Sequence, residues 1–342
     1  MKLCYWTVFP NTYQMALLEA LRAYGVDVVA CYFKQYDADR MAMGWKSRPL
    51  REWEFQVRSP AEARRLIRDY DERIQSVGAF FNLTYWRIAL RCSMKGLPWI
   101  VLTEGTRGRW FMRPLFAIFA KLANRHARHV FCIGQRALEQ FRRVGVEESK
   151  SSWFSYVTPP PPVKLPPRDE QLTFVFSGSL TERKAVDVMA EAFRRVHDEF
   201  PCVHFLVVGD GPMRSLLADQ EGVELVGGIA QEEVYANVAR GHVMLLVSRY
   251  DPWGVSLMEG AMCSQAMIGS DQTGAAKDLI VDGVNGFLVK TGDADSLTEA
   301  MRRYARDPAL AERHGQSARR TVEQTTGAEA ARRILAKLGG RV

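Results

Sequence analysis

The sequence predicts an α/β protein with two doubly wound domains, each a parallel sheet with helices on both faces. Its 342 residues leave room for two domains. Short apolar runs alternate with amphipathic helical segments, which is typical of parallel sheets. Four consecutive prolines, at residues 159–162, interrupt this alternation near the middle of the chain. Because prolines lack amide donors and force an extended backbone, we expect a linker between two domains that face each other across a cleft.

The first domain is expected to cover residues 1–158. It opens with a buried strand, a helix and a second strand, at residues 3–9, 13–24 and 26–32. A charged helical stretch follows, and then three apolar runs separated by helical segments. The charged stretch covers residues 60–76, and the three apolar runs, read as strands, are residues 77–81, 99–103 and 129–133.

The second domain is expected to cover residues 169–325, after a linker at residues 159–168. Residues 296–338 are mostly helical, with a break near Gly327. We therefore expect residues 326–342 to form a C-terminal helix that packs back on the first domain. The strands predicted for the second domain are residues 172–177, 203–209, 223–226, 243–247, 266–269 and 286–289.

Composition narrows the class of protein. Hydrophobic residues make up 47% of the chain and charged residues 25%, which is typical of a globular protein. The six cysteines form no CxxC pair, so we expect no zinc site and a reducing, cytoplasmic environment. The first residues read as a strand rather than a signal peptide. No apolar run approaches the roughly 20 residues needed to span a bilayer.

The positive charge is confined to the first half. Residues 1–165 hold 26 Lys and Arg against 14 Asp and Glu, a net charge of +12, and residues 166–342 hold 20 against 25, a net charge of −5. Such asymmetry indicates an anionic partner for the first half. We expect peripheral association with an anionic membrane surface rather than nucleic acid, because no nucleic-acid-binding motif is present. The alternative is a core helix with a solvated basic edge. The candidate membrane-surface residues are Arg107, Arg109, Trp110, Arg113, Phe116 and Lys121.

The most informative segment, residues 251–262, follows a predicted strand and opens a helix. The free amides of Gly254, Val255 and Ser256 would point at a bound anion, aided by the helix dipole. Glu259 lies one turn further along, within reach of hydroxyls on the same ligand, and Asp251 lies before the turn. Alternatively, Glu259 only complements the helix dipole.

Two other strand–helix junctions follow the same logic. Gly178 ends one strand, with Arg183 and Lys184 just beyond it, and Gly209 ends the next. Alone, each could be an ordinary turn or solvated surface. Together they place glycines, two cations and a helix N-terminus at the carboxyl ends of parallel strands, where ligands bind in such sheets.

With these residues, the second half resembles the donor domain of glycosyltransferases of family 4, which have the GT-B fold of two Rossmann-like domains. The resemblance implies that Arg183 and Lys184 bind the diphosphate of a nucleotide sugar and that residues 254–256 hold its phosphates. It also implies that Glu259 binds the ribose, Asp251 the donor sugar, and the backbone of Gly228 and Ile229 the nucleobase. The sequence departs from the family at Asp251, where the family usually has the longer Glu.

The first half resembles the family's acceptor-binding domain less specifically. The acceptor site implied there is Asn11 and Tyr13, after the first strand, together with Glu104, after a middle strand. Glu104 is also a candidate to contact the donor sugar. A second interpretation of Glu104 is a loop carboxylate paired with Arg107 or Arg109.

The resemblance implies retaining transfer without a metal or other cofactor. The acceptor hydroxyl would attack from the face that the diphosphate leaves, and a phosphate oxygen would take its proton. Catalysis would then come from positioning and charge stabilisation, with Asp251, Glu104, Lys184 and Arg183 as the candidate catalytic residues. The expected acceptor is a lipid-linked or cell-envelope polysaccharide at the cytoplasmic face of the membrane. A nucleotide-sugar epimerase and a catalytically degenerate nucleotide-sugar-binding protein are the alternatives.

Overall fold

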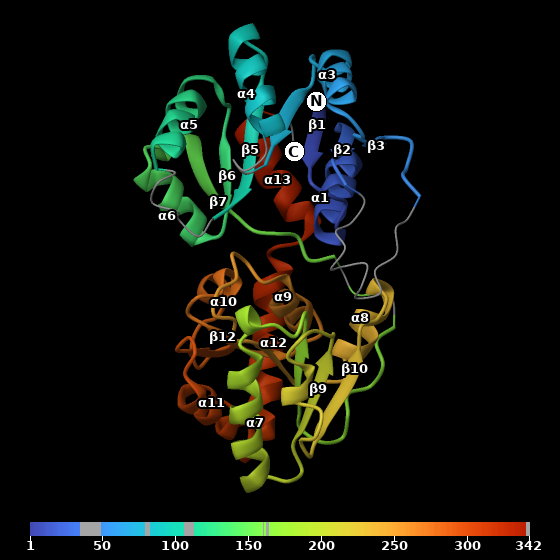
Figure 1. Ribbon diagram of the computed structural model, residues 1–342, viewed down its shortest axis with the longest axis vertical. Helices are drawn as coiled ribbons and strands as arrows, with labels where there is room; N and C mark the ends of the chain where they lie inside the picture. The colour runs from blue at the N-terminus through green and yellow to red at the C-terminus, as the bar shows by residue number, and fades with distance from the viewer. Residues whose placement is uncertain (35–48, 79–82, 106–112, 160, 162–163, 340–342) are drawn as a thin grey trace. The chain divides into compact units, whose positions relative to one another are not determined.

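The computed structural model describes residues 1–34, 49–78, 83–105, 113–159, 161 and 164–339. It folds into two compact units, each built on a sheet whose neighbouring strands are parallel (Figure 1). The first unit contains the sheet of strands β1 to β7, and the second contains β8 to β13. The chain passes from the first unit to the second after Pro159 and returns to the first after Gln324. The predicted fold class is confirmed.

The first sheet has the strand order β3-β2-β1-β4-β5-β6-β7. Its middle strands are buried, because helices cover the sheet between successive strands. The strands are β1 (Lys2–Thr7), β2 (Asp27–Tyr32), β3 (Glu54–Gln56), β4 (Ile74–Val77), β5 (Trp99–Glu104), β6 (Val130–Ile133) and β7 (Ser151–Phe154). The described helices of this unit are α1 (Thr12–Ala23), α3 (Pro60–Asp69), α4 (Leu83–Lys95), α5 (Arg113–His126), α6 (Gln135–Arg143) and α13 (Gly327–Leu338).

Strand β4 differs from the prediction. The sequence suggested a helix through residue 76 and a strand from residue 77, whereas α3 ends at Asp69 and β4 spans Ile74–Val77. The strand was not predicted because the polar side chain of Gln75 interrupts its apolar pattern. It is fully buried, where it accepts a hydrogen bond from Trp6 Nε1 at 2.8 Å and donates one to the Tyr70 carbonyl at 2.7 Å. A buried polar residue with partners fits a central strand but breaks the apolar pattern.

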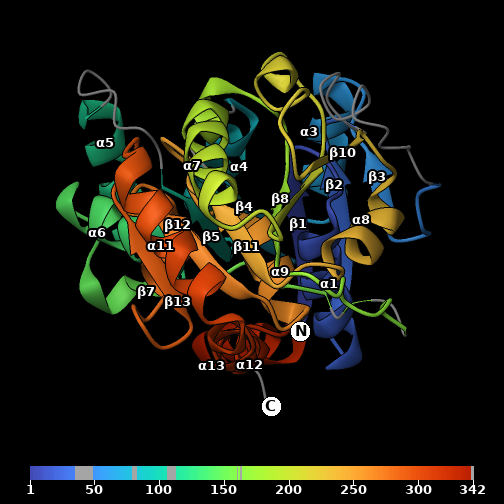
Figure 2. The ribbon, with the colours of Figure 1, turned by 90° about the horizontal axis from the view of Figure 1, so that it is seen from below.

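The second sheet has the strand order β10-β9-β8-β11-β12-β13. Figure 2 shows helices on both of its faces, and contacts pair α7 with α11 and α9 with α12. The strands are β8 (Thr173–Ser177), β9 (His204–Val208), β10 (Val223–Gly227), β11 (Val243–Leu246), β12 (Ala266–Ser270) and β13 (Gly286–Val289). The helices are α7 (Val186–Glu199), α8 (Gln231–Val238), α9 (Val255–Met262), α10 (Gly274–Leu279), α11 (Ala294–Arg306) and α12 (Pro308–Glu323).

The C-terminal region contains one more break than expected. Asp307 separates α11 from α12 and caps α12, because its Oδ1 accepts the Leu310 amide at 3.2 Å and Pro308 opens the helix. The final helix, α13, packs against α1 of the first unit. A Cβ added to Gly327 would lie only 2.9 Å from the Ala16 carbonyl oxygen, so this contact needs a glycine.

One of the predicted membrane-surface residues of helix α5 is buried instead. Phe116, named as a membrane-surface residue, is buried in the hydrophobic core together with Phe119. Ile118, two residues further along the helix, is 59% exposed. Apolar side chains lie on more than one side of α5, so the sequence alone left the rotation of the helix undetermined. Of the other membrane-surface candidates, Lys121 is exposed, and Arg107, Arg109, Trp110 and the side chain of Arg113 lie outside the described residues.

Candidate active site

The loops after β8 and β9 meet at their glycines. The Gly178 amide donates to the Val208 carbonyl at 2.9 Å, which brings the two loops together. Gly209 has a φ of +139°, and a Cβ added to it would lie 2.0 Å from the Gly178 carbonyl oxygen. Only a glycine allows this approach. The two predicted glycines therefore position the loop that leads to Arg183.

Helix α9 begins at a strained turn. Gly254 is its N-cap, with a φ of +97°, and an added Cβ would lie 2.4 Å from Leu246 Cδ2. The turn is therefore packed tightly against the end of β11. Val255 and Ser256 follow as the first two residues of the helix, and both are half-buried. Their amides belong to the first turn, where backbone donors have no partner within the helix.

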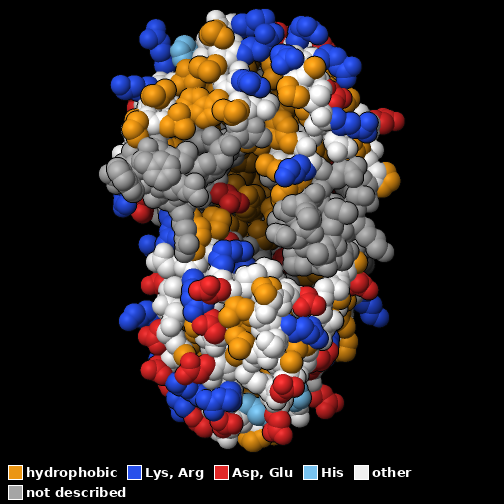
Figure 3. Space-filling view, in the orientation of Figure 1, with side chains coloured by type: hydrophobic (Ala, Val, Ile, Leu, Met, Phe, Trp, Pro, Cys, Tyr) orange, Lys and Arg blue, Asp and Glu red, His pale blue; other side chains and the backbone are white. Residues whose placement is uncertain are grey.

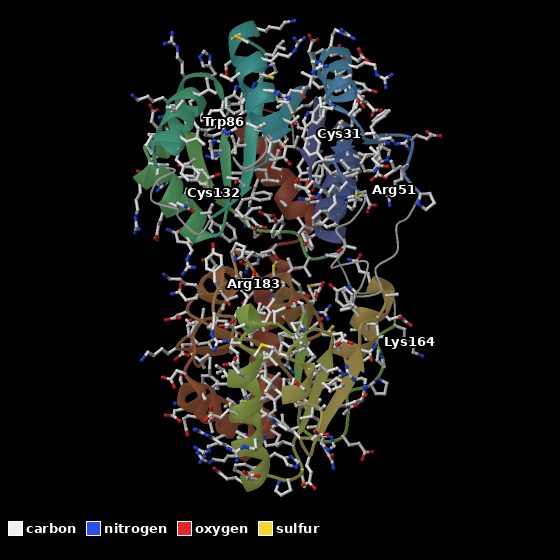
Figure 4. All side chains as sticks on the ribbon, viewed as in Figure 1. Cys31, Arg51, Trp86, Cys132, Lys164 and Arg183 are labelled. Atoms are coloured by element: carbon white, nitrogen blue, oxygen red, sulfur yellow. The ribbon has the colours of Figure 1, made fainter. Side chains whose placement is uncertain are left out.

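Asp251 lies between the two predicted cations. Its Oδ2 accepts from Lys184 Nζ at 2.7 Å and from Arg183 Nη1 at 3.1 Å (Arg183 is labelled in Figure 4). Its Oδ1 accepts the Trp253 amide at 3.3 Å. Burial favours the neutral carboxyl, but the two cations outweigh it and hold the pKa of Asp251 below its usual value. The structure thus brings together three predicted residues, with the carboxylate ionised.

Two residues that sequence reasoning missed hold this arrangement in place. Arg249 forms an ion pair with Asp187 at 2.6 Å. Its backbone amide donates to the Arg183 carbonyl at 2.9 Å, and its Nη1 donates to the Glu182 carbonyl at 2.8 Å. The loop after β11 is thereby tied to the turn that carries both cations. No local sequence pattern signals this link, because its partners lie 62 residues apart.

Glu259 lies on α9, eight residues beyond Asp251, and is half-buried. Burial raises its pKa to about 7, opposed by the positive charge of Lys184. Within the described residues its carboxyl group makes no hydrogen bond. A carboxyl that is near neutrality at physiological pH and has unused acceptors is suited to bind hydroxyl groups. Gly228 and Ile229, in the loop between β10 and α8, are exposed and half-buried, respectively.

In the first unit, Tyr13 and Glu104 are joined through Tyr156, which the sequence did not single out. The Tyr156 hydroxyl donates to Glu104 Oε1, and the rings of Tyr13 and Tyr156 lie with centroids 4.7 Å apart. Burial and the charge of Glu104 raise the pKa of Tyr156 well above its usual value, so it remains a donor. Glu104 ends β5, while Tyr156 follows β7, so the carboxyl ends of separate strands supply the cluster.

Asn11 has a structural role in the first unit, and its contact with an acceptor stays a prediction. Its Oδ1 accepts the Gln14 amide at 2.8 Å and caps α1, and the side chain is buried. The proposed pairing of Glu104 with Arg107 or Arg109 falls outside the described residues. In the part of the chain that the structure describes, no group of His, Cys, Asp or Glu could hold a metal ion. No described helix is long and apolar enough to cross a membrane.

The second-unit site combines a helix N-terminus, two cations and a half-buried carboxyl. Helix N-termini and cations both bind phosphate groups. The carboxyl one turn along the helix can accept hydrogen bonds from hydroxyls. This set of groups is chemically suited to a ligand that contains both phosphates and a sugar.

Two family models match the chain. Residues 10–151 match the glycosyl transferase 4-like domain, and residues 161–321 match glycosyl transferases group 1. The α-D-kanosaminyltransferase of Streptomyces kanamyceticus is 26% identical over 157 residues, which are 44% of this chain and 40% of that protein. The gpi3 subunit of the Schizosaccharomyces pombe phosphatidylinositol N-acetylglucosaminyltransferase is 28% identical over 142 residues, 39% and 31% of the two chains. The matches thus span less than half of these relatives.

Solved structures match nearly the whole chain. Anabaena HepE in complex with UDP superposes with a TM-score of 0.78 at 15% identity, covering 99% of this chain and 100% of that one. Sucrose-phosphate synthase from Thermosynechococcus elongatus gives 0.75 at 17% identity, with 99% and 98% covered. These likenesses show the fold, and the family models show the domains. The chain belongs to the GT-B glycosyltransferases, with a 4-like domain followed by a group 1 domain.

Proposed function

We propose that this protein is a retaining glycosyltransferase that moves a sugar from a nucleoside-diphosphate donor to a hydroxyl of a lipid-linked or cell-envelope polysaccharide. The observation that carries the proposal is the pairing of Arg183 and Lys184 around Asp251, three residues before the N-cap of α9. The group 1 domain contains this entire site. The structures of HepE with UDP and with UDP-glucose support a nucleotide-sugar ligand for this fold.

The donor contacts follow from the chemistry of the site. Arg183 and Lys184 bind the diphosphate, and the amides of residues 254–256 donate to its oxygens. Glu259 accepts from the ribose hydroxyls. As the sugar–phosphate bond breaks, negative charge develops on the departing diphosphate, and fixed cations stabilise it in the transition state. No nucleophilic side chain is required.

The acceptor is assigned to the first unit. Aromatic rings and a carboxylate together suit a sugar, because rings pack against its C–H face and carboxylates accept from its hydroxyls. Tyr13, Tyr156 and Glu104 supply this combination. The acceptor hydroxyl attacks on the face that the diphosphate leaves, and a phosphate oxygen of the leaving group receives the proton.

The same proposal places the protein on the cytoplasmic membrane surface, through a face of α4 and α5. Trp86 of α4 packs against Phe119 of α5, with ring centroids 5.4 Å apart (Trp86 is labelled in Figure 4). Figure 3 shows apolar side chains gathered over these helices, with Lys and Arg around them. Apolar side chains bordered by cations suit an anionic lipid surface. The exposed apolar residues are Leu83, Leu90, Met94, Leu115 and Ile118, and the exposed cations are Arg87, Lys95, Lys121 and Arg125.

A ligand-binding panel tests the donor site. The thermal midpoint of the protein is measured with UDP-, GDP- and ADP-sugars, and the sugars that bind are then tested for transfer to lipid-linked glycans. We expect one nucleotide class to raise the midpoint, and Glu259→Ala to reduce that shift. Asp219→Ala, a charge removal on the exposed loop after β9, is the control. The proposal fails if no nucleotide changes the midpoint, and the ribose assignment fails if Glu259→Ala binds as tightly as the parent.

The transfer products separate the proposal from its alternatives. A transferase forms a glycosidic bond and releases a nucleoside diphosphate in equal amounts. An epimerase would leave the nucleotide sugar intact with an inverted ring carbon, and a degenerate protein would bind without turnover. Analysis of the anomeric configuration by NMR then tests retention, and an inverted product would overturn the retaining mechanism.

A further inference from the structure

Asp251 is engaged by the groups proposed to bind the diphosphate. Its carboxylate contacts both cations, at 2.7 Å and 3.1 Å, and its side chain is only 10% exposed. The Lys184 side chain is likewise 10% exposed, whereas that of Arg183 is 47% exposed. Three charges therefore share one site, with a sum of +1. A diphosphate that binds these cations must lie close to the negative charge of Asp251.

The released product and the intact donor differ in charge. In a nucleoside-diphosphate sugar each phosphate is esterified and carries one negative charge, so the diphosphate carries two. Transfer frees a terminal phosphate, which ionises a second time with a pKa of about 6. At pH 8 the free nucleoside diphosphate therefore carries three negative charges. Repulsion from Asp251 grows in proportion to the charge of the ligand.

We propose that Asp251 is a specificity-determining residue that weakens the binding of the free nucleoside diphosphate more than that of the intact nucleotide sugar. The carboxylate orients the two cations but cancels half of their charge. Compared with a site that lacks this carboxylate, the site loses more affinity for the highly charged product than for the donor, so the product leaves more readily. This inference rests on the proposed function, because it takes the diphosphate to lie at the cation pair.

The test compares two ligands on one charge-removing variant. The dissociation constants of UDP and UDP-glucose are measured by calorimetry at pH 8 and low salt for the parent and for Asp251→Asn. If another base is preferred, its diphosphate and sugar take their place. We expect Asp251→Asn to bind UDP about tenfold more tightly and UDP-glucose about fivefold more tightly, because the changes in binding free energy should follow the ligand charges of three and two. UDP should also become a stronger product inhibitor.

A pH series adds a readout that a purely structural role would not change. The parent-to-variant ratio of dissociation constants for UDP should fall between pH 8 and pH 5.5, as UDP loses its third charge. The same ratio for UDP-glucose should stay flat. The protein groups that face the ligand, Arg183, Lys184 and Glu259, are present in both proteins. UDP-glucose is the control for their titration, because it meets the same groups but keeps its charge over this interval.

Control variants separate charge from shape. Asp169→Asn removes one charge from an arginine-paired aspartate elsewhere in the second unit, at 3.2 Å from Arg240, and should change neither affinity. Asp251→Glu keeps the charge and should keep the preference. If Asp251→Asn does not fold, as judged by circular dichroism, Asp251→Ser removes the same charge with a smaller side chain.

The outcomes are distinguishable. If the parent binds no nucleotide, the proposed function fails and this inference fails with it. If the parent binds UDP and Asp251→Asn binds it equally or more weakly, Asp251 only orients the cations and the inference is overturned. It is also overturned if both ligands tighten by the same factor, because the carboxylate then does not discriminate between them.

Discussion

The two units share one architecture but use positive charge differently. In the second unit, whose half of the chain is net acidic, two cations surround the buried carboxylate of Asp251. In the first, whose half is net basic, Lys121 and Arg125 form no ion pair within the described residues and lie on the same helix as the exposed Ile118. Two cations held in position by a carboxylate suit one small ligand. Exposed cations spread over a surface suit an extended partner.

The largest expected effect comes from removing the buried cation of the second unit. Lys184→Ala leaves Asp251 buried with one partner, which should lower the free energy of unfolding by about 3 kcal/mol. Transfer should fall at least a hundredfold, because a cation at the departing phosphate is lost. Urea unfolding and initial rates measure both effects. Lys95→Ala, in a half-exposed pair with Asp71 in the first unit, is the control and should cost under about 1 kcal/mol.

A pH titration of stability tests the environment of Glu259. Its ordinary pKa of 4.5 is raised to about 7 by burial, so folding favours the protonated form. The stabilisation is complete below pH 4.5 and is lost as the pH rises through about 7. We expect the free energy of unfolding of the parent, relative to Glu259→Gln, to fall over this interval. Equal slopes for the two proteins would show that the carboxyl is not buried as the structure has it.

A substitution at the N-cap of α9 tests the tight turn. Gly254→Ala must adopt a positive φ and place its Cβ 2.4 Å from Leu246 Cδ2. It should cost about 2–3 kcal/mol and weaken nucleotide binding. Gly292→Ala also has a positive φ but meets nothing within 4 Å. It is the matched control, with a cost of about 1 kcal/mol. If the two substitutions lower the free energy of unfolding equally, the close contact with Leu246 does not add to the cost at Gly254.

The smallest effect on stability is expected on the first unit's exposed face. Leu90→Glu combined with Met94→Glu changes two exposed side chains, so the free energy of unfolding should change by under about 1 kcal/mol. Sedimentation with anionic liposomes should fall several-fold, since acidic groups replace apolar ones at an anionic surface. The paired control adds two acids at exposed apolar residues of the second unit, Leu216→Glu with Val284→Glu, and should leave sedimentation close to that of the parent. If the α4 variant sediments with liposomes as well as the parent does, the membrane contact does not lie on this face.

The strands, the turns and the passage between the two units were the features most predictable from the sequence. The apolar runs located most strands, the prolines located the passage between the units, and glycines marked turns that need a positive φ. The weak elements were missed. The short strands β3 and β7 carry polar residues, and β4 was displaced along the chain because Gln75 is buried there. Periodicity reports burial only when the buried residues are apolar.

What the sequence determined by itself is local: the alternation of strands and helices, the two-domain division and the residues at the ends of particular strands. These follow from the periodicity and conformational freedom of neighbouring residues. Only the tertiary structure decided that Asp251 contacts Arg183 and Lys184, that Tyr156 joins Tyr13 to Glu104, and that Phe116 faces the core. Such contacts depend on strand order and helix rotation, which are fixed by packing between segments far apart in the chain.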